Sequence, residues 1–123
     1  MGINDNNSID GRELKRMVSE KGILPLGIER DGKFHREFEI RPALVRDSVE
    51  LSAEQDPKRL ENERFSEACK VAKQLLCVGD IRPITLEIVE DMFVVDLEEV
   101  KAAQGRLGTR LQSFHAQEEQ PNG

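Results

Sequence analysis

The dipeptide Asp31-Gly32 constrains the fold of this chain more than any other local feature. A tight hairpin turn needs positive φ angles, which glycine adopts without steric cost. The flanking runs, residues 23–30 and 33–41, suit two β-strands, and the second alternates between apolar and polar positions until Pro42 ends it. The sequence therefore predicts a β-hairpin near the N-terminus.

The chain after Pro42 has a helical pattern. A first helix is expected over residues 43–55. A second is expected over residues 57–78, because Asp56 can cap it, Pro57 suits the first helical position and Gly79 suits its end.

Two further helices have recognisable starts. Thr85 is the expected cap of a short helix that points Leu86, Val89 and Phe93 inward. Asp96 and Glu99 resemble a capping box, which starts a last helix that runs to about Phe114. The predicted fold class is α+β, with an N-terminal β-hairpin followed by about four α-helices.

The length of 123 residues suits one domain, predicted over residues 21–115. Residues 1–20 are expected to be a partly disordered extension, with a short helix over 9–20, and residues 116–123 a disordered tail. Five Phe are the only aromatic residues, so the core must be mainly aliphatic.

The net charge of -6 argues against a nucleic-acid partner, because binding to phosphates depends on clustered Lys and Arg. Cys69 and Cys77 fall in one predicted helix, too far apart for a disulfide, and reduced cysteines fit the cytoplasm. No apolar run is long enough to span a membrane, and residues 1–10 do not resemble a signal peptide.

No set of residues indicates catalysis, and we expect no enzyme, cofactor or metal site. The two histidines, His35 and His115, are far apart in the sequence, and His35 is expected to face solvent from the hairpin. Acidic residues are numerous, but they fall at helix starts and on polar faces, where the helix dipole and solubility explain them.

The last helix carries a heptad-like seam, which is the candidate partner-binding site. Two interpretations stay open: a core face, which we favour, or a surface for a partner helix. Gly105 and Gly108 favour the second, because glycine weakens a helix interior. The seam consists of Leu97, Val100, Gln104, Leu107, Leu111 and Phe114.

The order of several short motifs resembles the tail assembly chaperone family of Mu-like phages and prophages. The resemblance covers roughly residues 24–114. The motifs are Asp31-Gly32-Lys33, Phe38-Glu39-Ile40-Arg41-Pro42, Val45-Arg46-Asp47, Leu76-Cys77-Val78-Gly79-Asp80-Ile81, Ile84-Thr85 and the segment from Asp96 to Ala102.

This resemblance implies a protein of the host bacterial cytoplasm that is absent from the mature virion. It would bind the helix-rich tail tape measure protein and help recruit subunits of the tail tube protein. The alternative is a small regulatory protein that binds DNA or a repressor, with Lys101, Arg106 and Arg110 as its basic helix. Self-association into a homo-oligomer stays open.

Overall fold

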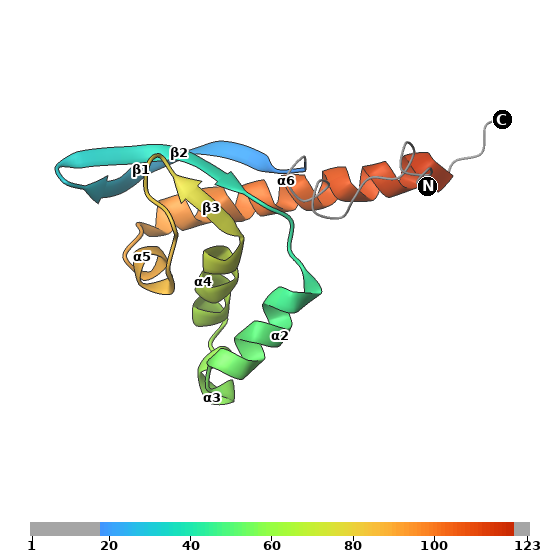
Figure 1. The fold of residues 1–123 in the computed structure, drawn as a ribbon, viewed down its shortest axis with the longest axis horizontal. Helices are drawn as coiled ribbons and strands as arrows, with labels where there is room; N and C mark the ends of the chain where they lie inside the picture. The colour runs from blue at the N-terminus through green and yellow to red at the C-terminus, as the bar shows by residue number, and fades with distance from the viewer. Residues whose placement is uncertain (1–17, 120–123) are drawn as a thin grey trace, which may run out of the picture.

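The predicted hairpin is confirmed by a computed structural model that describes residues 18–119, with side chains to residue 113. Strands β1 (Glu20–Arg30) and β2 (Lys33–Ile40) pair antiparallel (Figure 1). At the turn Asp31 has φ 58° and Gly32 has φ 78°, as a primed turn requires. The Gly32 N–H donates to Glu29 Oε2 at 2.7 Å and so closes the turn.

The middle of β1 departs from regular pairing with β2. The register shifts between Ile23 and Ile28, and Arg36 Nε donates to the Leu24 carbonyl at 2.8 Å within this irregular stretch. Gly27 has φ 105°, and a Cβ there would lie 2.8 Å from the His35 carbonyl oxygen. Only glycine fits this position, and the irregularity turns the edge of β1 toward the last helix.

The prediction of one continuous helix over residues 57–78 is wrong, because the helix is interrupted once and ends before residue 78. Helix α3 (Pro57–Leu60) ends early, and α4 (Glu63–Gln74) starts again where the Asn62 side chain accepts from the Phe65 N–H at 3.0 Å. The last four residues form a third strand, β3 (Leu75–Val78), antiparallel to β2. A short apolar run suits a buried strand as well as a helix, and here pairing with β2 favours the strand.

The other helices are α2 (Val45–Glu54), α5 (Leu86–Glu90) and α6 (Val94–Glu119). Two predicted caps are confirmed. The Asp56 side chain accepts from the Lys58 N–H at 2.9 Å, and Thr85 Oγ1 accepts from the Ile88 N–H at 3.3 Å. Gly79 has φ 57° and ends β3, not a helix. The α+β class is confirmed.

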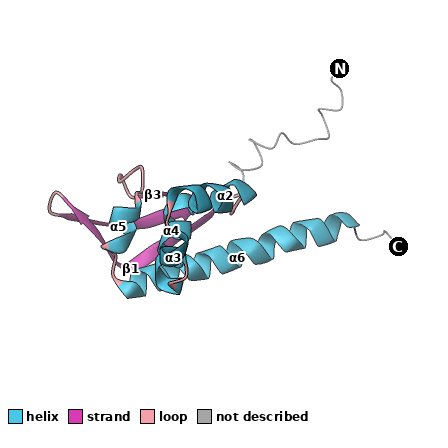
Figure 2. Ribbon diagram, turned by 90° about the horizontal axis from the view of Figure 1, so that it is seen from below, coloured by secondary structure: helices cyan, strands magenta, loops and turns pink. Residues whose placement is uncertain are grey.

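Helix α6 lies along the sheet and then projects past the other elements (Figures 1 and 2). One aliphatic core joins the sheet, α4, α5 and the first half of α6. Val18 belongs to this core and β1 begins at Glu20, and both lie before the predicted start of the domain at residue 21. The largest of the fully buried apolar side chains are Leu24, Ile40, Val71, Val78, Ile81, Val100 and Leu107.

The predicted inward position of Phe93 is wrong, because this side chain is 52% exposed. Phe93 precedes α6, and its carbonyl accepts from the N–H groups of Asp96 and Leu97 at 3.0 and 3.1 Å. Helix α6 thus starts three residues earlier than the proposed capping box would place it. Leu86 and Val89 do pack toward the core, as predicted.

Asp96 has a role that the capping-box interpretation did not predict. Its side chain is fully buried, and its two carboxylate oxygens accept from the Leu26 and Gly27 N–H groups at 2.8 and 2.9 Å. These are backbone donors of the irregular stretch of β1. Asp96 therefore attaches the first turn of α6 to the sheet edge, and its charge also suits the positive end of the helix dipole.

Candidate partner-binding groove

The structure divides the predicted seam into two parts. Leu97, Val100 and Leu107 are buried in the core of the domain, which is the interpretation favoured from the sequence. Gln104 and Leu111 are half-buried. Phe114 lies in α6, but its side chain is outside the described residues. The part of the seam open to a partner therefore lies around Gln104 and Leu111.

These two residues line a groove between α4 and α6, which we name the α4/α6 groove. It has a volume of about 340 Å³, and Pro42 and Ala43, in the connection from β2 to α2, contribute to its lining. Much of its exposed lining is apolar, which suits an amphipathic helix better than a small polar ligand. The lining residues are Pro42, Ala43, Glu67, Lys70, Gln74, Lys101, Gln104, Leu107, Gly108 and Leu111.

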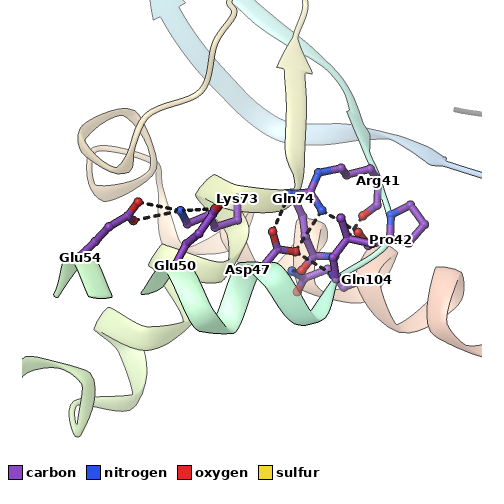
Figure 3. A network of polar contacts seen from close by, with 9 residues as sticks. Arg41, Pro42, Asp47, Glu50, Glu54, Lys73, Gln74 and Gln104 are labelled. Atoms are coloured by element: carbon purple, nitrogen blue, oxygen red, sulfur yellow. Dashed lines mark hydrogen bonds and ion pairs between the residues drawn. The ribbon is translucent and has the colours of Figure 1, made fainter. Parts of the chain in front are cut away.

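A chain of hydrogen bonds through Gln74 holds the two walls together (Figure 3). Gln104 Nε2 donates to Gln74 Oε1 at 2.9 Å, which joins α6 to α4. Gln74 Nε2 donates to the Arg41 carbonyl at 3.1 Å, and the Arg41 N–H donates to the Gln74 carbonyl at 3.0 Å. The side chain of Gln104, the one polar residue of the seam, is thus satisfied within the domain.

Arg41 and Asp47 fix the connection from β2 to α2, which lies beside the groove. The Arg41 guanidinium donates to both carboxylate oxygens of Asp47 at 2.8 and 3.0 Å, and to the Pro42 carbonyl at 2.8 Å. Asp47 also accepts from the Leu44 N–H at 2.8 Å. The hydrogen bond from Arg41 lowers the pKa of the Asp47 carboxyl below its ordinary value of 3.8, outweighing the opposing effect of burial.

This lowered pKa predicts a pH dependence of stability. Asp47 binds a proton more weakly when folded than when unfolded, so its contribution is present above the unfolded pKa and is lost as pH falls through the folded pKa. Asp47→Asn should cost roughly 2 kcal/mol at pH 7. Urea unfolding at pH 7 and at pH 3 measures this, and the difference between wild type and variant should shrink at the lower pH.

A pH-independent difference would contradict this role of the Asp47 charge. Glu50→Gln is the matched control on the same helix. Glu50 pairs with Lys73 at 3.2 Å, but the Glu50 side chain is 45% exposed, and Lys73 keeps a second partner in Glu54 at 2.9 Å (Figure 3). A partly exposed pair whose cation keeps another partner contributes at most about 1 kcal/mol, so the control should change stability little at either pH.

Gly105 and Gly108 differ in a way that the sequence does not reveal. A Cβ at either position would meet no atom within 4 Å, so the fold itself needs neither glycine. Gly108 lines the α4/α6 groove, whereas Gly105 does not. Gly108 leaves the α6 backbone open on the groove side, where an approaching helix would gain close contact.

The basic helix of the regulatory alternative is largely neutralised within the domain. Lys101 pairs with Glu67 at 2.9 Å. Arg106 and Arg110 both pair with Glu20, at 2.9 and 2.7 Å. Phosphate binding would have to compete with these contacts.

Other candidate chemistry is sparse in the described residues. Between residues 18 and 113, no three His, Cys, Asp or Glu side chains come together as metal ligands would. Cys77 lies in β3, so the prediction of one helix for both cysteines is wrong, and both are free thiols. His35 is half-buried and so only partly faces solvent, and its Nδ1 accepts from the Asp80 N–H at 3.4 Å. No helix in the described part could cross a membrane.

Comparison of this chain with family models, with curated proteins and with solved structures found no match. The resemblance to the tail assembly chaperones therefore stays a prediction that rests on the motif order. Sequence reasoning found Gln104, Leu107 and Leu111 by their spacing. It missed the groove's other walls, because Pro42, Ala43 and Gln74 meet α6 only through tertiary contacts.

Proposed function

We propose that this protein is a phage or prophage tail assembly chaperone. It binds an apolar helical stripe of the tail tape measure protein and helps to recruit tail tube subunits while the tail is being built. It acts in the host cytoplasm and is not part of the mature virion. The observation that supports this proposal best is the open α4/α6 groove, whose apolar lining fits the face of an amphipathic helix.

The groove suits a helix that must be held and later released. Leu111 is half-buried and Gly108 is exposed, so the partner meets a surface that is only partly covered before binding. Apolar area of this kind supports moderate affinity, and the partner's stripe would be covered while it is bound. The net charge of -6 supports solubility of the complex.

The proposal predicts that substitutions at Gly105 and Gly108 affect stability alike but affect binding of the partner helix differently. Gly108→Leu and Gly105→Leu should each stabilise the isolated protein by up to about 1 kcal/mol, because glycine is the weaker helix former. Only Gly108→Leu places a side chain in the α4/α6 groove. It should weaken binding of a helical tape measure segment by about tenfold or more, as the loss of one good apolar contact would.

Fluorescence anisotropy with a labelled tape measure segment measures this difference. The segment should come from the phage or prophage that encodes this chain. Equal affinities of the two variants would remove the groove from the binding site. If neither variant nor the wild type binds any segment of the tape measure protein, the chaperone proposal itself fails.

A further inference from the structure

The first described residues fix the place at which the preceding segment of the chain joins the domain. Val18 is buried in the core, and Glu20 pairs with Ile40 in the hairpin. Continued by two residues, this antiparallel register leads Val18 toward Pro42, which lines the α4/α6 groove. The segment before Val18 therefore joins the domain beside the groove.

Helix α6 holds this start of the chain from the other side. Arg106 and Arg110 donate to the two carboxylate oxygens of Glu20 at 2.9 and 2.7 Å. Arg110 also donates to the Ser19 carbonyl. The next residue of α6, Leu111, lines the groove. Two walls of the groove, α6 and the connection from β2 to α2, thus flank the point at which the preceding segment joins.

That segment, residues 9–17, has the sequence pattern of a short amphipathic helix. Leu14 and Met17 are three residues apart and would share one face of it. The two acids precede Leu14 and Met17 by four residues each, so they adjoin the same face: Asp10 and Glu13. The three bases fall on the other side of such a helix: Arg12, Lys15 and Arg16.

The charges that line the groove favour an occupant with an acidic margin. Of the three charged lining residues, Glu67 and Lys101 bind each other at 2.9 Å. Both also contact a second pair, Arg64 and Glu98, so this network balances two cations against two carboxylates. Lys70 is exposed and has no Asp or Glu partner within 4 Å among residues 18–113. The acids of the segment would supply that partner.

The covalent connection favours this segment over a separate helix of the same chemistry. Leu14 is four residues before Val18, a span of about 13 Å for an extended chain and about 6 Å for a helix. A segment tethered so closely has an effective concentration in the millimolar range at the groove. Two apolar contacts and one ion pair are then enough to keep it bound.

We infer that residues 9–17 form a helix that occupies the α4/α6 groove of the same chain when no partner is bound. Leu14 and Met17 cover the groove beside Gly108 and Leu111. This occupancy does not depend on the tape measure proposal. Its consequence does rest on that proposal: a tape measure helix has to displace the segment, so the groove is covered until the partner arrives.

A single tryptophan tests where the segment lies, because the full chain has no Trp and no Tyr. Leu14→Trp should show blue-shifted emission and an acrylamide quenching constant severalfold below that of Arg12→Trp, the matched variant on the opposite face. Met17→Trp should behave as Leu14→Trp does. Emission from both variants that equals that of Arg12→Trp would overturn the inference.

The two glycines of α6 show whether the α4/α6 groove is the site that the segment occupies. Adding Gly108→Leu to Leu14→Trp fills the groove and should move the emission back to the red, whereas adding Gly105→Leu should not. Emission that both additions leave unchanged would overturn the assignment to the groove. So would a blue shift that appears only at concentrations where sedimentation shows a dimer, because the segment would then bind a second copy.

Affinity for a tape measure segment tests the consequence separately. The double variant Leu14→Asp with Met17→Asp should bind that segment severalfold more tightly than the wild type, because the internal occupant is gone. Equal affinities would overturn the displacement. If neither protein binds any tape measure segment while Leu14→Trp remains blue-shifted, the chaperone proposal fails and the occupancy of the groove stands.

Discussion

Asp96→Ala should lower the free energy of unfolding by about 3 kcal/mol, the larger part of which comes from two backbone donors left without partners. The Leu26 and Gly27 N–H groups both bind this buried carboxylate, and the irregular pairing of β1 gives them no replacement on β2. Urea unfolding followed by circular dichroism measures the loss. Asp96→Asn should be intermediate, because an amide offers one acceptor oxygen where the carboxylate offers two.

Glu99→Ala is the control that separates this account from a capping box. In a capping box the two side chains act as a pair, so loss of either would cost a similar amount. In the structure Glu99 is half-buried and is not bonded to Asp96. Glu99→Ala should therefore cost well under about 1 kcal/mol. Equal losses for Asp96→Ala and Glu99→Ala would contradict the attachment of α6 to β1.

Leu107→Asp should unfold most of the protein. Leu107 is 2% exposed within the aliphatic core, and an aspartate there would be a buried charge without a partner. We expect a loss of more than about 4 kcal/mol, which is most of the stability of an ordinary domain of this size. Circular dichroism in the absence of denaturant should show loss of helical signal.

Leu111→Asp is the comparison one helical turn further on. Leu111 is half-buried at the edge of the α4/α6 groove, so its variant should stay folded while losing affinity for a tape measure segment. If Leu107→Asp stays folded and only loses binding, Leu107 is a contact residue and its place in the core is wrong. If Leu111→Asp unfolds, the groove edge is part of the core.

Signals that act within a few residues predicted the fold well. The turn at Asp31-Gly32 and the caps at Asp56 and Thr85 each depend on local hydrogen bonds or φ angles, and each is confirmed. The aliphatic core also followed from the scarcity of aromatic residues. These features need no knowledge of which segments meet in space.

Features that depend on distant segments were missed. Strand β3 is a run of four residues whose conformation is decided by pairing with β2. Asp96 has the sequence pattern of a cap, yet its partners lie 69 and 70 residues earlier in the chain. The α4/α6 groove requires the Gln74 and Gln104 side chains to meet across 30 residues. Periodicity identified one wall of the groove and could not identify the other.

The soluble yield of the tape measure protein tests the central claim most directly. The tape measure protein encoded by the same phage or prophage would be expressed alone, with the wild-type chain, with Gly105→Leu and with Gly108→Leu. We predict that the wild type and Gly105→Leu raise the soluble fraction severalfold and purify with it, whereas Gly108→Leu does neither. A soluble fraction that is the same with and without the wild-type chain would contradict the chaperone proposal.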